Sequence, residues 1–125
     1  MDELDPRSPV PLYEQIAARI RVAVAAEEYS AGDALPSVRQ LAASLRVNPA
    51  TVVQAYRDLE REGFVDMRHG AGTFVRAVPP EKRKAEQKRQ ARRLARGVLA
   101  EAARLGISGQ ELLAAVGAAV GGSDV

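Results

Sequence analysis

Cysteine and tryptophan are absent from this 125-residue chain, and histidine occurs once. The lack of cysteine excludes disulfides and thiol chemistry, and a single histidine argues against a zinc site. No apolar run approaches the roughly 18–20 residues that a membrane span needs. The acidic start "MDELDPRSP" has no apolar core of the kind found in secretory signals. We therefore expect a cytoplasmic protein with no membrane contact, no metal and no cofactor.

Enzymatic chemistry also lacks its usual residues. The one histidine, His69, has no nucleophile or acid arranged beside it in the sequence. The chain shows no metal-ligand cluster and no convincing pair of acid–base groups. We therefore expect a binding protein rather than an enzyme.

Positive charge is concentrated in one segment. The net charge is only +2, but residues 81–96, "EKRKAEQKRQARRLAR", hold eight Lys or Arg and two Glu, which leaves −4 for the rest of the chain. Such a block is often the solvated face of a helix. It also suits phosphate contacts that supplement another DNA-binding element, or a nucleic-acid-binding arm that acts alone.

The first half of the chain has the pattern of three helices. Apolar residues recur at helical spacing in "VPLYEQIAARIRVAVAAEEY". Ser37 and Gln40 form a capping-box pattern at the start of a short second helix. Asn48 and Pro49 suit the cap and first position of a third, and Gly63 is a natural stop. The residues expected to face a core are Leu12, Ile16, Ala17, Ile20, Ala23, Val24, Val38, Leu41, Ala42, Leu45, Val52, Ala55, Tyr56 and Leu59.

A hairpin is predicted directly after the third helix. Two β-like stretches, "FVDM" and "TFV", flank the glycine-containing segment "RHGAG". The segment is not a phosphate-binding P-loop, because it lacks the lysine and joins two strands rather than a strand and a helix. His69 therefore lies at a loop tip, where its alternatives are a solvent-exposed turn and a contact with DNA.

Two further helices are predicted after the break "VPP" at 78–80. They are separated by "GIS", and Ser108 with Glu111 repeats the capping-box pattern. Their apolar stripes could pack on the chain's own first domain or form a two-fold interface, which we favour, and a ligand pocket between them stays open. The candidate interface residues are Leu94, Val98, Leu105, Leu112, Leu113 and Val116.

The order of these elements is that of a winged helix-turn-helix, in which the third helix enters the major groove of DNA. The motif "G-D-x-LPS-x-R-x-LA" is followed by "V-x-x-x-TV-x-x-AY-x-x-L-x-x-EG" and then by "GxGTFV". Over residues 11–75 the chain therefore resembles the GntR family of bacterial transcription regulators. Its short helical tail resembles the YtrA subfamily, where such a tail is the dimerisation module.

The resemblance implies DNA contacts at two helices and the wing. Arg39 matches an arginine that lies near phosphate in the family, and Gln54 has the chemistry to read adenine. The amides at the start of the third helix are expected to be free for a phosphate. The full candidate set is Ser37, Arg39, Asn48, Pro49, Thr51, Val53, Gln54, Arg57, Arg68, His69, Gly70, Gly72 and Thr73.

Alternative roles exist for several of these residues. Arg39 could form a surface salt bridge, and Arg57 and Arg61 could pair with nearby acidic residues at little energetic gain. Tyr56 is expected in the core first and as a phosphate contact second. Two positions depart from the family pattern: Pro49 replaces an arginine of some relatives, and Val53 is apolar where others are charged, so it could at most touch a thymine methyl.

The sequence thus predicts a mostly α fold with a small β-hairpin. We expect an N-terminal tail at 1–10, a winged helix-turn-helix domain at 11–78 and a helical dimerisation or regulatory tail at 79–125. The expected function is a homodimeric, sequence-specific repressor that binds a pseudo-palindromic operator in double-stranded DNA. We expect an unknown signal to release it, and a small-molecule effector is one candidate for that signal. The alternative is a nonspecific architectural or protein-interaction module.

Overall fold

The structure, a computed structural model, describes residues 4–122. Those residues form α1 (Leu12–Ala25), α2 (Val38–Leu45), α3 (Pro49–Arg61), β1 (Val65–Arg68), β2 (Gly72–Val75), α4 (Pro80–Arg104) and α5 (Gly109–Gly122). The chain divides into two compact units, Met1–Gln87 and Lys88–Val125, and α4 crosses the division. The mostly α fold with one hairpin is confirmed.

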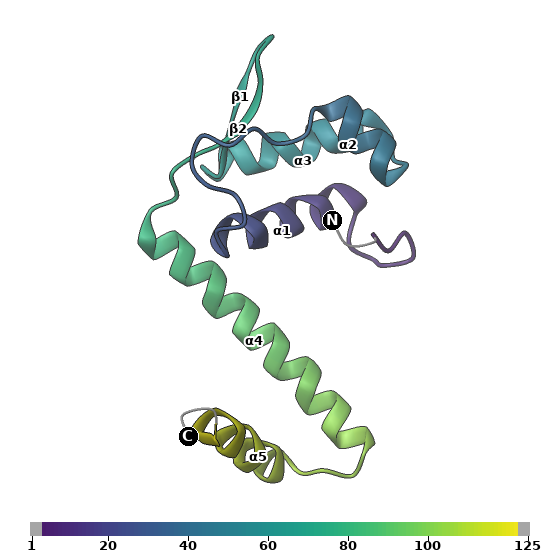
Figure 1. The fold of residues 1–125 in the computed structure, drawn as a ribbon. Coiled ribbons are helices and arrows are strands. Elements are labelled where there is room, and N and C mark those ends of the chain that lie inside the picture. The colour runs from purple at the N-terminus through teal and green to yellow at the C-terminus, as the bar shows by residue number, and fades with distance from the viewer. Residues whose placement is uncertain (1–3, 123–125) are drawn as a thin grey trace. The chain divides into compact units, whose positions relative to one another are not determined.

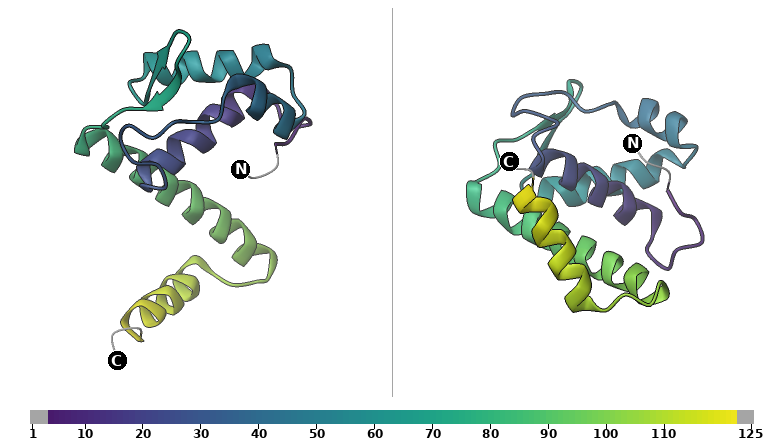
Figure 2. Two further views of the ribbon diagram at one scale, coloured as in Figure 1. Left: turned by 45° about the horizontal axis from the view of Figure 1, so that its top comes forward. Right: turned by 60° about the horizontal axis from the view of Figure 1, so that its bottom comes forward.

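The core of the first unit lies among α1, α2 and α3, which Figure 1 and Figure 2 show side by side. Each helix contributes one apolar face at the spacing that the sequence predicted. The largest fully buried side chains are Tyr56, Ile16, Ile20, Leu59, Val52 and Val65. Of the other predicted core positions, Leu12 and Ala23 are half-buried, and Val38 and Leu45 pack at the edge of the core.

Side-chain caps fix the start of α2 and of α3. Ser37 Oγ accepts a hydrogen bond from the Gln40 amide at 3.0 Å, and Gln40 Oε1 accepts one from the Ser37 amide, which completes the predicted capping box. Asn48 Oδ1 accepts from the Ala50 amide at 2.9 Å, with Pro49 at the first helical position. Local sequence therefore determines where both helices of the helix-turn-helix begin.

The hairpin β1–β2 is antiparallel and extends from the C-terminal end of α3 (Figure 1). Its register pairs Val65 with Val75 and Arg68 with Gly72. The base is anchored twice: Glu60 Oε2 accepts from the Met67 amide at 2.7 Å, and Ala34 forms a β-bridge with Phe74. Strand β2 is thus paired on both sides at its base, which fixes the hairpin against the helices.

The first turns of α4 pack onto the first unit. Arg83 pairs with Glu27 at 3.1 Å, and Gln87 donates to the Ala25 carbonyl at 3.4 Å. Val78 is buried, and Lys82 donates to the carbonyl of Glu62, the residue that follows α3. The first compact unit therefore includes the start of α4 as far as Gln87, because polar side chains of α4 join it to α1 and to the end of α3.

Residues at both ends of the chain were predicted as tails. At the N-terminus, the Gln15 side chain accepts from the Asp5 amide and donates to the carbonyls of Asp5 and Val10, so residues 5–10 are tied to α1. Residues 1–3 and 123–125 lie outside the described residues.

The second unit consists of the rest of α4, a turn and α5. Gly106 has φ 76° in the turn, and Ser108 with Glu111 forms the predicted capping box through two hydrogen bonds of 3.1 and 3.2 Å. Ala102 is buried here, and the larger apolar side chains are exposed. Those exposed side chains are Leu94, Val98, Leu99, Leu105, Ile107, Leu113, Val116 and Val120.

Candidate nucleic-acid interface

Helix α3 has one buried face and one open face. Val52, Ala55, Tyr56 and Leu59 are each 0% exposed. On the other side, Arg57 is exposed and the side chains of three candidate residues are half-buried: Thr51, Val53 and Gln54. The spacing of three residues between Thr51, Gln54 and Arg57 keeps these polar groups on one side of the helix. The open face is therefore the part of α3 that is available to another molecule.

Contrary to the prediction, the backbone amides in the first turn of α3 already have hydrogen-bond partners. Pro49 has no N–H, the Ala50 amide donates to the Asn48 side chain, and the Thr51 amide donates to the Asn48 carbonyl at 2.9 Å. The cap thus uses the donors that a phosphate would need. Any contact at this end of the helix must come from side chains such as Thr51 rather than from backbone amides.

Gln54 is held by its own helix. Its Nε2 donates to Asp58 Oδ1 at 3.0 Å, and Arg61 donates to the same oxygen at 2.9 Å. A bidentate contact with adenine requires both the amide nitrogen and the amide oxygen of Gln54. The amide nitrogen of Gln54 carries two N–H donors, so the bond to Asp58 uses one of them and leaves the other, with the amide oxygen, for adenine.

Two arginines of the candidate set have open side chains. Arg39 and Arg57 are exposed, and neither forms a salt bridge within residues 4–122. Arg39 thus has no acidic partner among the described residues for the alternative role of a surface salt bridge. By contrast, the predicted pairing of Arg61 with an acidic neighbour is present, as the contact to Asp58 shows. Arg39 and Arg57 keep their full set of donors for an anionic ligand.

One exposed arginine was missed in the sequence. Arg46 ends α2 in the left-handed conformation, with φ 57° and ψ 48°, and is exposed two residues before the Asn48 cap of α3. A helix ends at φ > 0 most often on glycine or asparagine, so the sequence gives no signal for an arginine at this position. The turn between α2 and α3 therefore adds a cation to this region.

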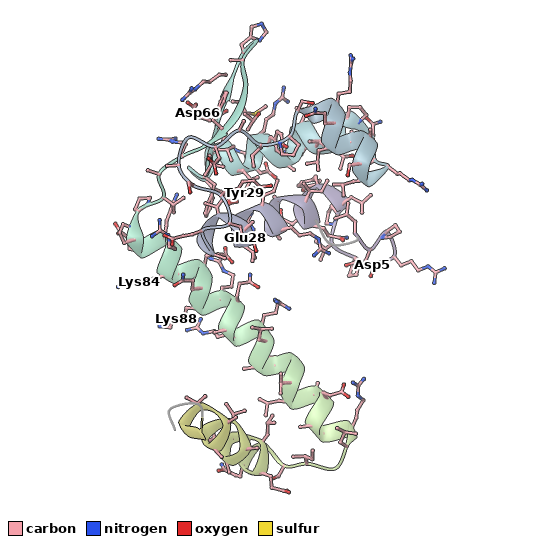
Figure 3. All side chains as sticks on the ribbon, in the orientation of Figure 1. Asp5, Glu28, Tyr29, Asp66, Lys84 and Lys88 are labelled. Carbon is pink, nitrogen blue, oxygen red and sulfur yellow. The ribbon has the colours of Figure 1, made fainter. Side chains whose placement is uncertain are left out.

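The wing carries its charge near an aromatic ring. The Arg68 guanidinium lies 4.7 Å from the centre of the Phe74 ring and pairs with Asp66 at 3.2 Å, and Figure 3 labels Asp66 on the hairpin. His69, Gly70 and Gly72 are exposed at and beside the tip. Gly70 has φ 76° and Gly72 has φ 123°, a backbone region that disfavours side chains. The glycines are thus required by the turn itself, whatever the wing binds.

Thr73 does not belong with the exposed wing residues. It is 6% exposed, and its carbonyl accepts from the Leu35 amide at 2.8 Å. The strand alternation that exposes Gly72 turns the Thr73 side chain toward the core. The prediction of a DNA contact through its side chain is corrected accordingly, and Thr73 has a structural role in this conformation.

Tyr56 links α3 to the segment before α2. Its hydroxyl donates to the Pro36 carbonyl at 2.7 Å. Burial, with a smaller contribution from Tyr29, raises the pKa of Tyr56 well above its ordinary value. The hydroxyl is therefore neutral and committed to Pro36, which agrees with the expected core role rather than with a phosphate contact.

Apolar side chains dominate the open surface of the second unit. Five of the six predicted interface residues, Leu94, Val98, Leu105, Leu113 and Val116, are between 46% and 67% exposed. The sixth, Leu112, is half-buried. An exposed apolar surface of this kind commonly marks a contact with another protein.

Residues 4–122 contain no group of three or more His, Cys, Asp or Glu side chains able to hold a metal ion. None of the helices formed by these residues is both long and apolar enough to cross a membrane.

Comparisons with known proteins agree with this geometry. The family model "Bacterial regulatory proteins, gntR family" matches residues 12–75. The HTH-type transcriptional repressor YtrA of Bacillus subtilis is 44% identical over 75 residues, which cover 60% of this chain and 58% of that protein. A second Bacillus subtilis regulator, YhcF, is 44% identical over 57% of its length. The chain thus matches somewhat more than half the length of these curated relatives.

Solved structures extend the likeness beyond the winged helix. A GntR family transcriptional regulator from Listeria monocytogenes is 31% identical with a TM-score of 0.67, covering 90% of this chain and 96% of that chain. YtrA from Sulfolobus acidocaldarius, a GntR-family transcription factor, is 36% identical with a TM-score of 0.59, covering 74% and 96% respectively. The chain therefore belongs to the GntR family and is a YtrA-like transcriptional regulator with a DNA-binding winged helix-turn-helix.

Proposed function

We propose that this regulator is a homodimeric repressor that binds a pseudo-palindromic operator. In each protomer α3 lies in the major groove, the wing at 68–73 lies against the minor groove and Arg39 lies near a phosphate. Two copies related by a two-fold axis read two half-sites about one helical turn apart. Because the activity requires chromosomal DNA, we place it in the cytoplasm.

The observation that carries this proposal is the open face of α3. Thr51, Gln54 and Arg57 offer a hydroxyl, an amide and a guanidinium on the side opposite the core. Hydroxyls and amides hydrogen-bond to base edges, and guanidinium groups bind guanine or phosphate. Arg39 on α2 and His69 on the wing add donors from two other elements. This combination suits a duplex with a specific sequence.

The dimer proposal rests on the exposed apolar side chains of the second unit. Leu94 is 56% exposed and Val98 is 46% exposed. Replacing both with glutamate places two charges in the proposed interface, and we expect monomers by light scattering. The control replaces Ala100 and Ala103 with glutamate, which adds the same charge at exposed positions on another side of α4. A double variant L94E/V98E that remains dimeric would contradict the placement of the interface.

Repression is proposed from the similarity to YtrA of Bacillus subtilis, which is named as a repressor. A bound dimer would block a promoter and leave it when a signal arrives. A small-molecule effector acts in this way only if it binds one conformation of the dimer more tightly than the other. Promoter activity in a reporter strain, measured with and without the regulator, tests the direction of control.

Selection of bound sequences from a random duplex library at near-physiological salt tests the central claim. Enrichment of a two-fold-symmetric motif is expected. On that motif, Arg39→Ala and Thr51→Ala should each weaken binding, by about 1–3 kcal/mol where a base contact is lost. Arg7→Ala is the matched control, because Arg7 is exposed on the N-terminal segment. Binding without any enriched motif would instead support the nonspecific architectural alternative.

A further inference from the structure

Helix α4 carries two stripes of opposite character with the same spacing. Ala91, Leu94, Ala95 and Val98 recur at i, i+3, i+4 and i+7 and form an apolar stripe. Arginines recur with the same spacing, displaced by two residues, at Arg89, Arg92, Arg93 and Arg96. A displacement of two residues is about 200° around a helix, so the two stripes lie on opposite sides. The four arginines are here called the arginine stripe.

Three arginines of this stripe, Arg92, Arg93 and Arg96, have no Asp or Glu within four residues in sequence. Residues 88–100 contain five Lys or Arg and no Asp or Glu. All four arginines of the stripe are exposed. Within residues 4–122, Arg92 and Arg96 form no salt bridge, and Arg93 Nε donates only to the uncharged Gln90 side chain, at 2.8 Å. Like charges three and four residues apart repel one another on a helix. Binding of a polyanion to these arginines would therefore relieve the repulsion between their charges.

We propose that the arginine stripe binds phosphates of duplex DNA that α3 and the wing do not contact. This inference rests on the proposed function, because the winged helix must first bring the chain to DNA. From Arg89 to Arg96 the helix rises by seven residue steps, or about 10.5 Å. One DNA strand has a phosphate every ~3.4 Å along its axis, so the stripe matches about three phosphates. One guanidinium group can donate two parallel hydrogen bonds to two oxygens of the same phosphate, which the ammonium group of lysine cannot do.

Chain connectivity favours DNA over other polyanions. Lys88 directly follows Gln87, whose side chain donates to the Ala25 carbonyl of the DNA-binding unit. The stripe begins one residue later, so it is covalently joined to the unit that binds DNA. Tethering of this kind raises the effective concentration of the second binding event. Anionic membranes are the competing partner, because basic amphipathic helices also bind lipid surfaces.

The test compares two triple variants of the full chain with the wild type. The first is Arg92→Gln, Arg93→Gln and Arg96→Gln, which removes three charges and keeps similar helix propensity. The control, Arg7→Gln, Lys84→Gln and Arg104→Gln, removes three exposed charges outside the stripe. Circular dichroism at 222 nm checks that both remain helical. The ligand is a fluorescent duplex of fixed, arbitrary sequence, and the dissociation constant is measured from 50 to 200 mM salt.

Each phosphate contact adds about 0.9 to the slope of log Kd against log salt. The stripe variant should therefore lower that slope by between about 1 and 3 for each protomer, and the control should leave it unchanged. Equal slopes for the stripe variant and the control would overturn the proposal. So would a stripe variant that loses binding only to vesicles of phosphatidylserine and phosphatidylcholine, since the partner would then be a membrane.

The two proposals fail in different ways. If library selection yields no motif but the stripe variant lowers the salt slope, the sequence-specific function fails and the stripe still binds duplex DNA. If a symmetric motif appears and the slope does not respond, the function stands and the stripe proposal is wrong.

Discussion

Replacing Tyr56 with phenylalanine removes one hydrogen bond and keeps the ring in the core. The hydroxyl donates to the Pro36 carbonyl at 2.7 Å, and the residue is 0% exposed. A carbonyl that loses its partner costs about 1–3 kcal/mol when fully buried. Pro36 is half-buried, so water replaces part of the lost bond, and we expect a loss of about 1–2 kcal/mol in the free energy of unfolding. In a unit of this size, thermal denaturation should show Tm lower by on the order of 5–10 °C.

The same substitution should change the dependence of stability on pH. Burial raises the pKa of Tyr56 in the folded state above its unfolded value of about 10. Above pH 10 the unfolded chain loses this proton more readily than the folded chain, so stability falls as pH rises. The contribution of one such group reaches up to about 1.4 kcal/mol per pH unit. The wild type should thus lose stability between pH 10 and 11 more steeply than Tyr56→Phe.

Tyr13→Phe provides the matched control. Tyr13 is half-buried beside the same core, and no hydrogen bond of its hydroxyl is present within the described residues. We expect urea or thermal denaturation to place this variant within about 0.5 kcal/mol of the wild type. The contrary result would be that the two variants are equally stable at pH 7, with free energies of unfolding that fall equally steeply above pH 10. In that case the hydrogen bond between α3 and Pro36 makes no energetic contribution.

Three further substitutions test individual parts of the fold. Leu59→Ala in the centre of the core should lower the free energy of unfolding, measured by urea denaturation, by about 2–5 kcal/mol. A loss below about 1 kcal/mol would mean that neighbouring side chains fill the cavity or that Leu59 is not buried. Ser37→Ala removes the cap of α2 and should cost about 1 kcal/mol, with Ser44→Ala on the exposed side of α2 as the control. Gly70→Ala, at φ 76° in open space, should cost about 1 kcal/mol through the backbone alone, so equal thermal stability would exclude the left-handed conformation at the wing tip.

Local patterns predicted much of this fold. Ser37 with Gln40 and Asn48 with Pro49 determine where two helices begin, and both caps are present in the structure. The apolar residues of α3 recur with a period that only a helix brings onto one face. These predictions succeeded because each depends on residues a few positions apart.

Contacts between distant segments were not predictable in the same way. Arg21 on α1 makes two hydrogen bonds, of 2.8 and 3.0 Å, to Glu62 at the end of α3. The bridge from Ala34 to Phe74 adds part of the segment between α1 and α2 to the hairpin. Neither contact leaves a periodic signal, since the partners lie tens of residues apart. Such contacts also explain why Thr73 is buried.

Side-chain competition limited the prediction of the candidate interface. The chemistry of Gln54 suggests a reader of adenine, and the sequence alone does not show that Asp58 one turn later accepts one of its two amide protons. Likewise, Asn48 was recognised as a cap, and the same cap uses the amides expected to be free for phosphate. A residue type shows what a group is able to bind, and its neighbours determine whether the group is available.

The hairpin separates a fixed base from an exchangeable tip. At the base, Glu60 holds the Met67 amide and Ala34 pairs with Phe74. At the tip, a Cβ added to Gly70 would meet no described atom within 4 Å. For protein engineering, residues 69–71 are therefore a segment that can be replaced without changing the helices or the base of the hairpin. The new residue at position 70 must tolerate a positive φ. A library at these positions would vary what the wing touches while leaving the helix-turn-helix as it is.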